Sequence, residues 1–173
     1  MAKNKKKNRS KKIGNKFENK IAKLLGQWWF NDKHALTRHG TSGAIKEAWI
    51  GDIVPQKLIP WKGFPFVIEC KSGYEESYPN LLFQTKLKNW IIQYSREVTE
   101  QQPILMMVTA YKKPNPILTI PRTFDKIEWN SAILVDGEVW YNYNLNYLIN
   151  HYNFYEITES WKDIRNIIKG GER

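Results

Sequence analysis

The stretch Phe64-Pro65-Phe66-Val67-Ile68-Glu69-Cys70-Lys71 decides the fold. Its aromatic and β-branched residues are typical of a buried strand. Because successive side chains of a strand point to opposite faces, Ile68 and Cys70 share one face, and Glu69 and Lys71 share the other. The last two lie about 7 Å apart along the strand, so a carboxylate and an ammonium project together from an otherwise apolar segment.

Hydrophobic periodicity predicts helices and further strands around this segment. An apolar stripe at helical spacing predicts a first helix that starts at Ile13 and ends near Gly26, with Glu18 at the margin of the stripe. Strands are expected at 34–39, 51–54, 104–110 and 117–120, a hairpin at 132–135 and 139–141 around Asp136-Gly137, and further helices at 83–94, 145–151 and 158–169. This order predicts an α/β fold with a central mixed sheet flanked by helices.

Length and composition exclude several classes of protein. The chain has 173 residues, of which 42 % are hydrophobic, enough for one domain with its own core. No apolar run reaches the roughly 20 residues of a membrane-spanning helix, and no signal peptide is evident. The single cysteine, Cys70, excludes an internal disulfide and a cysteine-based zinc site. We therefore expect a soluble intracellular protein without a membrane partner.

Positive charge is concentrated at the N-terminus. The formal net charge is +10, and residues 1–12 contain no acid. Their cations are Lys3, Lys5, Lys6, Lys7, Arg9, Lys11 and Lys12. We expect 1–12 to be a basic arm that is disordered when free and contacts DNA phosphates, with a solubilising or targeting tail as the alternative. The remainder, 13–173, is expected to form one domain, with a core at 13–121 and a C-terminal hairpin and helices at 122–173.

The chemistry is expected from Glu18, Asp52, Glu69 and Lys71. Two carboxylates about 4 Å apart repel by roughly 4 kcal/mol at an effective dielectric near 20, unless a proton or cation lies between them. Mg²⁺, for which Mn²⁺ can substitute, prefers such oxygen ligands and suits Asp52 and Glu69, with the backbone carbonyl of Cys70 as a further ligand and Glu18 bound directly or through water. Lys71 would orient a water or offset charge on a phosphodiester.

The same residues resemble the PD-(D/E)XK nuclease superfamily, with Glu-x-Lys intact and Gly51 in place of the usual proline. The chain resembles more narrowly the archaeal-type Holliday junction resolvases carried by bacteriophages, over about residues 13–94. The matching motifs are Gly14-Asn15-Lys16-Phe17-Glu18, Trp28-Trp29, Thr37-Arg38-His39-Gly40-Thr41-Ser42-Gly43 and Ile68-Glu69-Cys70-Lys71-Ser72-Gly73-Tyr74.

This resemblance implies a restriction-endonuclease-like core and a homodimeric, Mg²⁺-dependent endonuclease that nicks opposing strands of a four-way DNA junction symmetrically. Glu18, Asp52, Glu69 and Lys71 match the active-site positions of the family. Arg38 and Ser42 match a basic residue and a mobile Gly-Ser loop that touch DNA, although the loop here reads Gly40-Thr41-Ser42-Gly43. A phage enzyme of this kind would act in the cytoplasm of the host cell.

Each of these residues also has an ordinary structural interpretation. Glu69 and Lys71 can form a surface ion pair, Asp52 can begin a turn, and Glu18 can flank a helix. Gln84, on the second predicted helix, would position the nucleophile or be a solvated residue. His39 is the one histidine with a possible phosphate contact, through its place in the suspected DNA loop.

Aromatic residues leave two further alternatives open. Trp28 and Trp29 would fill either a dimer interface or the core. The Tyr/Asn-rich stretch 140–155 would stack on unpaired bases or, as we favour, pack in the fold. Cys70 is interpreted as a small buried hydrophobe.

Two other functions compete with a junction resolvase. One is a different PD-(D/E)XK nuclease, of restriction or end-processing type, since the motif does not encode the substrate; an RNA substrate also stays open. The other is a noncatalytic basic protein that binds nucleic acid and has no use for the carboxylates.

Overall fold

The computed structural model describes residues 2–40, 49–56, 63–74, 81–111 and 115–169. Its helices are α1 (Ala2–Phe30), α2 (Leu81–Ser95), α3 (Leu145–His151), α4 (Phe154–Ile157) and α5 (Lys162–Lys169). Its strands are β1 (Leu36–Arg38), β2 (Ile53–Pro55), β3 (Phe66–Tyr74), β4 (Ile104–Tyr111), β5 (Ile117–Ile120), β6 (Ser131–Val135) and β7 (Glu138–Asn144).

The centre of the fold is a five-stranded mixed sheet in the order β3-β4-β5-β7-β6. Strands β3 and β4 are parallel, with Glu69 opposite Met107, and the remaining pairs are antiparallel. Strands β1 and β2 form a separate antiparallel pair, and a parallel bridge between Gly51 and Ile68 joins this pair to the β3 edge. The α/β fold with a mixed sheet is therefore confirmed.

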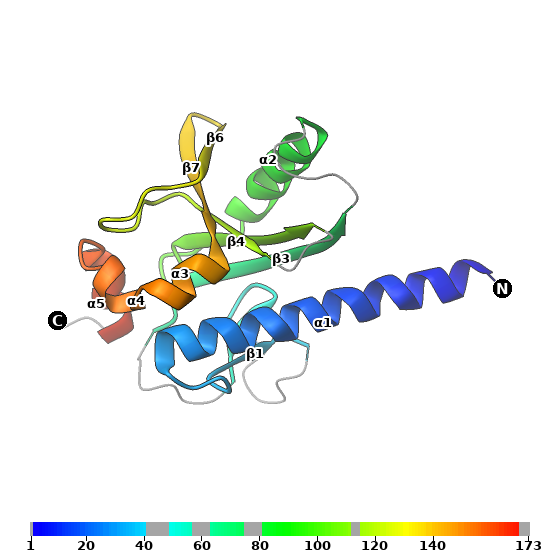
Figure 1. Cartoon of the computed structure of the whole chain (residues 1–173), viewed down its shortest axis with the longest axis horizontal. Coiled ribbons are helices and arrows are strands. Elements are labelled where there is room, and N and C mark those ends of the chain that lie inside the picture. Colours follow the sequence, from blue (N-terminus) through cyan, green and yellow to red (C-terminus); the bar gives the residue numbers. More distant parts are fainter. Residues whose placement is uncertain (1, 41–48, 57–62, 75–80, 112–114, 170–173) are drawn as a thin grey trace.

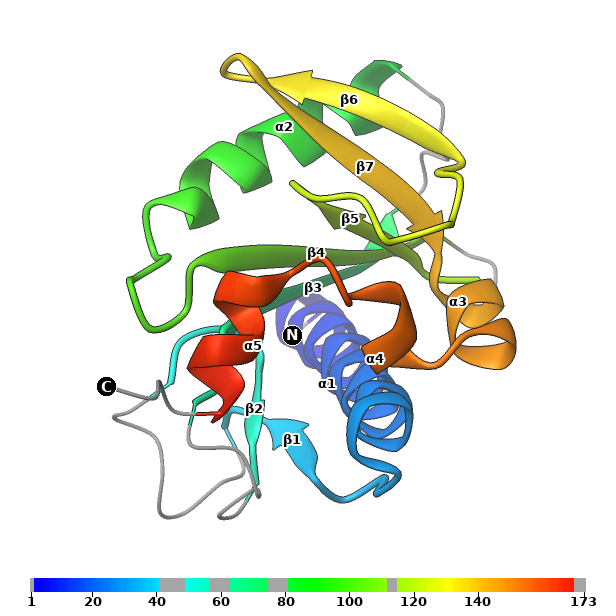
Figure 2. The same cartoon turned by 90° about the vertical axis from the view of Figure 1, so that its left-hand side faces the viewer.

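Helices cover both faces of the sheet. Helix α1 lies on one face together with α3, α4 and α5, whereas α2 lies on the other, beside the β6–β7 hairpin (Figures 1 and 2). The α1 side is a large apolar core that includes Ile21, Leu25 and Ile68. The α2 side is a smaller core in which Leu87 and Ile91 pack against Val67. Alternate residues of β3 therefore serve two different cores.

Helix α1 is longer at both ends than the sequence predicts. It begins at Ala2 and takes in the basic arm, which projects beyond the sheet (Figure 1). Lysine and arginine are good helix formers, and adding residues to an existing helix costs far less than nucleating one, so the arm can continue a helix that packing stabilises further on. The expectation that the free arm is disordered stays a prediction.

Several local expectations are confirmed. The turn at Asp136 and Gly137 has φ values of 48° and 85°, as a two-residue hairpin requires. Trp28 and Trp29 are both buried within the chain, and Trp28 Nε1 donates to the carbonyl of Tyr152 at 2.8 Å, so the core interpretation holds for both. The four-residue α4 was not predicted, because so short a helix has no detectable period. No helix among the described residues is long and apolar enough to cross a membrane.

Candidate active site at the β3 edge of the sheet

Strand β3 presents Glu69 and Lys71 on the face that α2 covers. Glu69 is 5 % exposed, and Lys71 Nζ donates to its Oε2 at 3.0 Å. Lys71 Nζ also donates to the hydroxyl of Tyr94 on α2 at 3.0 Å and lies 4.5 Å from the centre of the Tyr94 ring. The pair therefore consists of a buried carboxylate and a partly buried ammonium that is held by two hydrogen bonds, and it differs from an exposed ion pair in both solvation and rigidity.

Asp52 joins this pair from the edge of the sheet. Its backbone N–H donates to the carbonyl of Ile68 at 2.7 Å, and its Oδ2 accepts from the N–H of Cys70 at 2.8 Å. Gly51 makes the approach possible: its φ is +105°, and a Cβ there would lie 2.8 Å from the nitrogen of Ile68. Only glycine tolerates both conditions, which explains why this position carries glycine.

The backbone of Cys70 faces the same edge. Because the N–H of Cys70 and the carbonyl of Ile68 both bond to Asp52, alternate residues of β3 direct their backbone polar groups to this side, and the carbonyl of Cys70 follows. The Cys70 side chain lies in the α1 core, where burial, followed by the nearby carboxylates, raises the pKa of its thiol. Cys70 is a buried hydrophobe, as expected.

Two residues hold the Gly51–Asp52 segment in place. The His39 N–H donates to the carbonyl of Asp52 at 2.8 Å, and His39 Nδ1 lies 2.9 Å from the carbonyl oxygen of Gly51. Buried Gln102 accepts from the N–H of Ile50 at 3.0 Å and donates to the carbonyl of Phe66 at 2.7 Å. Sequence reasoning missed Gln102, because a glutamine in a loop carries no signal until its partners are known.

Glu18 reaches the site from α1, on the opposite face of the sheet. Its Oε2 lies 3.7 Å from Nε of Arg38 on β1, and both side chains are about one-fifth exposed, at 17 % and 21 %. Glu18 is therefore removed from open solvent, as its place on the helix predicted. Arg38 pairs with this carboxylate, and its contact with DNA stays a prediction.

The carboxylates influence one another electrostatically. Burial and then the charge of Asp52 raise the pKa of Glu69 to about 7, against the opposing effect of Lys71. Burial and then Asp52 also raise the pKa of Glu18, opposed by Arg38 and Lys71. Burial by itself would lower the pKa of Lys71, but its bonds to Tyr94 and Glu69 raise it instead. Three acids and one ammonium thus share one partly desolvated region.

The donor set suits a hard divalent cation. Asp52, Glu69 and the carbonyl of Cys70 offer oxygen ligands. Burial, followed by the charge of Asp52, raises the pKa values of Glu18 and Glu69, and a cation would favour the ionised forms of these carboxylates. Within the described ranges, no group of three or more acidic, histidine or cysteine side chains is placed so that it could hold a metal ion. Mg²⁺ does not require three such ligands, since it binds through one or two carboxylates and keeps several waters.

The other predicted residues take different places. Gln84 is in the first turns of α2, about 15 Å along the helix from Tyr94, and its role beside a nucleophile stays a prediction. Lys11 and Lys12 are exposed on α1. Ser42 and the side chains of Lys5, Lys6, Lys7 and Arg9 lie outside the described part of the chain.

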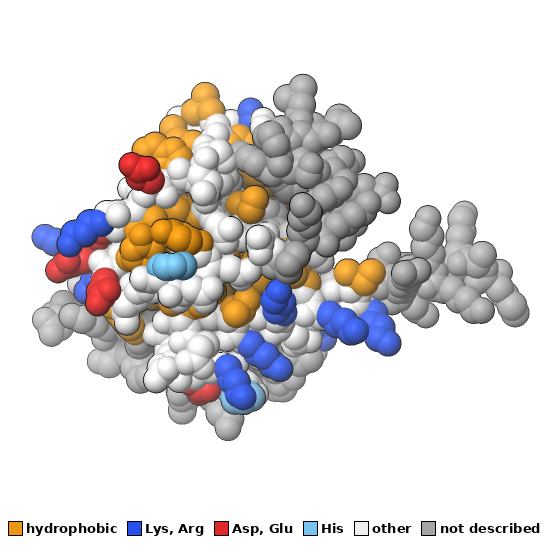
Figure 3. Space-filling model, in the orientation of Figure 1, with side chains coloured by type: hydrophobic (Ala, Val, Ile, Leu, Met, Phe, Trp, Pro, Cys, Tyr) orange, Lys and Arg blue, Asp and Glu red, His pale blue; other side chains and the backbone are white. Residues whose placement is uncertain are grey.

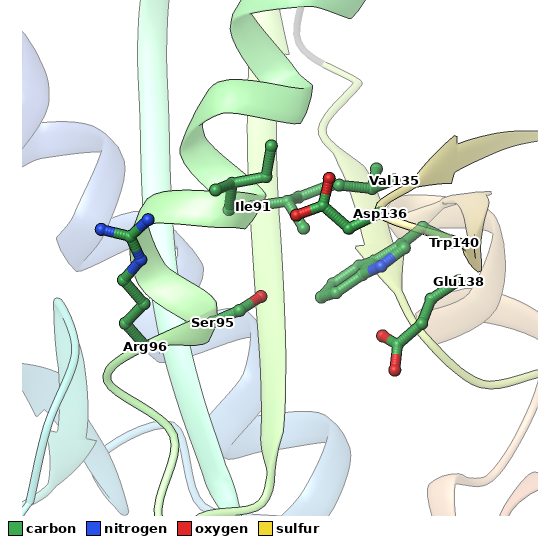
Figure 4. A pocket seen from close by; sticks show the side chains of 8 residues that line it. Ile91, Ser95, Arg96, Val135, Asp136, Glu138 and Trp140 are labelled. Atoms are coloured by element: carbon green, nitrogen blue, oxygen red, sulfur yellow. The ribbon is translucent and has the colours of Figure 1, made fainter.

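One cavity of the described part of the chain is lined by acidic residues other than these carboxylates. A cavity of about 310 Å³ lies between residues of α2 and of the β6–β7 hairpin (Figure 4). Asp136, Glu138 and Arg96 line it together with Trp140. Two acids and one base would repel rather than attract a phosphate, so we do not place DNA there.

The fold and the site together define a nuclease-like α/β protein with a Glu-x-Lys strand. Over residues 8–169 the sequence matches the family described as "Phage putative PDDEXK endonuclease". The match covers nearly the whole chain, and the protein belongs to this family. It confirms the resemblance to the PD-(D/E)XK superfamily and supports a nuclease. No curated protein and no solved structure matches the chain.

Proposed function

We propose that this protein is a Mg²⁺-dependent, structure-selective DNA endonuclease that makes paired, symmetric nicks in four-way junctions as a homodimer. The proposal of nuclease activity is supported by the convergence of Asp52, Glu69 and Lys71. Asp52 accepts a hydrogen bond from the backbone N–H of Cys70, and Glu69 accepts one from the ammonium of Lys71. The preference for junctions follows from the resemblance over 13–94.

Asp52 and Glu69, with the carbonyl of Cys70, would hold the cation, which when bound lowers the pKa of a water and offsets charge on the phosphodiester. Lys71 supplies a fixed positive charge, because Glu69 and Tyr94 hold its ammonium from two sides. Such a preorganised charge stabilises the negative charge that grows on a phosphate during hydrolysis. Glu18 adds a third carboxylate at the edge of the site.

A panel of DNA substrates tests the proposal. Purified protein with Mg²⁺ is given labelled four-way, nicked, linear duplex and single-stranded DNA, and the positions of the nicks are mapped. Paired nicks in opposing strands of the junction, with little cutting of linear duplex, are expected. Equal cutting of linear duplex would instead indicate a restriction-type or end-processing nuclease.

A noncatalytic nucleic-acid-binding protein makes the opposite prediction for two variants. Glu69→Ala would leave the binding function of such a protein intact, and deletion of 2–12 would abolish it. A nuclease loses cleavage with Glu69→Ala and keeps junction binding, because removing a negative charge near phosphates relieves repulsion. Measurement of the mass of the protein–junction complex checks whether two copies of the protein bind one junction, because a two-fold symmetric enzyme needs two copies to make paired cuts.

A further inference from the structure

Helix α1 carries a row of lysines on its solvent face. Lys12, Lys16, Lys20 and Lys23 are all exposed, and they follow one another at spacings of four, four and three residues. At about 100° per residue these positions fall within an 80° sector of the helix, opposite the buried residues Ile21, Ala22 and Leu25. Figure 3 shows blue side chains following α1 across the face of the molecule.

The row has no acidic neighbour on its own side of α1. Glu18 is the only acidic residue in the sequence of α1, and it lies on the other side of the helix. From Lys12 to Lys23 the row extends about 17 Å, and the same length of B-DNA axis carries about five phosphates on each strand. A row of this length and charge complements a nucleic acid backbone.

The direction of the row separates it from the candidate active site. Each of its four lysines projects about 120–160° around the helix axis from Glu18, whereas Lys11 projects only about 20° from Glu18. A helix with its side chains is about 10 Å across, so a strand that places its phosphate beside Glu18 cannot also follow the row. Lys11 can contact the strand being cut, and the row requires a different segment of DNA.

We propose that the row Lys12, Lys16, Lys20 and Lys23 binds the backbone of a second duplex arm, one that is not being cut by this site. The inference rests on the proposed branched substrate, because a branched DNA offers two arms that diverge around one protein. It assigns α1 two roles: its inner side supplies Glu18 to the site, and its outer side holds a neighbouring arm.

Binding without metal tests the row. In EDTA, the affinity for a four-way junction and for a linear duplex with the sequence of two stacked arms is measured over a series of salt concentrations. The variant is Lys16→Gln with Lys20→Gln. The matched control is Lys126→Asn with Lys162→Gln, which removes the same charge from exposed positions elsewhere; Asn suits the φ of 61° at position 126.

The row variant is expected to bind the junction about tenfold or more weakly, with a salt slope lower by about 2, and to bind the duplex almost as the wild type does. Equal loss on both DNAs would overturn the inference, because the row would then contact the arm that is cut. An equal loss of junction affinity in the control variant would show that only the net charge of the protein matters. No loss of affinity in the row variant would show that the row is a solvated face without contact to DNA. Either result would contradict the inference. Thermal unfolding confirms that both variants are folded.

The result is independent of the cleavage panel. A wild type that binds junctions through the row and cuts no DNA would refute the proposed nuclease and leave the row in place. A wild type that nicks junctions while the row variant binds them normally would refute the row and leave the nuclease in place.

Discussion

The two edges of the five-stranded sheet differ in what they bury. At the β3 edge, charged groups are withdrawn from water, and the pKa of Glu69 is raised to about 7, by burial first and then by Asp52. At the other edge, the β6–β7 hairpin leaves Leu134 and Val139 exposed, at 59 % and 43 %. Leu134 and Val139 are cross-strand partners, and a single exposed apolar pair is ordinary on a protein surface, whereas desolvated like charges cost stability and mark functional sites. The difference indicates that the β3 edge carries the functional site, whereas the residues of the hairpin edge serve the stability of the fold.

The largest effect is expected from Asp52→Asn. The asparagine keeps an oxygen to accept the Cys70 N–H but loses the negative charge, so cleavage falls by about a thousandfold, or about 4 kcal/mol of transition-state stabilisation. Single-turnover cleavage in Mg²⁺, with binding measured in EDTA, checks this. Leu134→Thr on the hairpin is the control and should cut normally. A cleavage rate of the Asp52→Asn enzyme within a few-fold of the wild-type rate would show that Asp52 is not part of the active site.

Two glycines compare the edges directly. Gly51 and Gly137 both have positive φ, at 105° and 85°, but only Gly51 has backbone atoms where a Cβ would go. Gly137→Ala should cost roughly 1–2 kcal/mol of unfolding free energy and leave cleavage unchanged. Gly51→Ala should cost at least about 3 kcal/mol and reduce cleavage, because Asp52 is displaced from β3. Urea unfolding and cleavage assays measure both, and equal effects at the two positions would contradict the asymmetry.

A smaller effect is expected from Tyr94→Phe. This change removes the hydroxyl that bonds Lys71 Nζ and keeps the aromatic ring beside the ammonium. A hydrogen bond to a charged group is worth about 1.5–3 kcal/mol, so cleavage should fall about tenfold or more while DNA affinity in EDTA stays the same. Tyr155→Phe on α4 is the matched control. A Tyr94→Phe enzyme with full activity would show that Glu69 suffices to hold Lys71.

The smallest effect is expected at an exposed ion pair, which provides a baseline for the buried charges. Arg122 donates two hydrogen bonds to Asp163, and these bonds, the largest cause, lower the pKa of the Asp163 carboxyl. A lowered acid pKa contributes stability above the pKa of the unfolded chain, and this stability disappears as the pH falls through the folded value. Asp163→Asn should therefore cost about 0.5 kcal/mol or less at pH 7 and almost nothing near pH 2, because most of the side chain is in water. Urea unfolding at both pH values measures it, and a larger cost at pH 2 would reverse the assignment.

Much of the fold could be predicted because its signals are local. The alternation along β3 predicts that Ile68 and Cys70 share one face and that Glu69 and Lys71 share the other. In the structure the first two lie in the α1 core and the last two form the ion pair of the candidate site. Asp136-Gly137 determined the hairpin by its turn conformation alone. The start of α1 could not be predicted, since a basic segment without apolar residues lacks the period that marks a helix.

The candidate site was only partly predictable. Asp52, Glu69 and Lys71 can be recognised by their spacing in the sequence. Tyr94, which contacts Lys71, and Gln102, which contacts Ile50, come from distant parts of the chain. A tyrosine on an amphipathic helix and a glutamine in a loop carry no separate signal. Their roles depend on which helix face meets which strand, and packing decides that.

The amino-acid sequence by itself determined the residue types of the site, the strand that presents Glu69 and Lys71, and the hairpin, because side-chain alternation and turn conformation are short-range properties. Only the tertiary structure decided that Gly51 brings Asp52 against β3, that Tyr94 meets Lys71, and that Arg38 of β1 meets Glu18 of α1. Those relations depend on burial of the two cores against the sheet, which fixes the elements relative to one another.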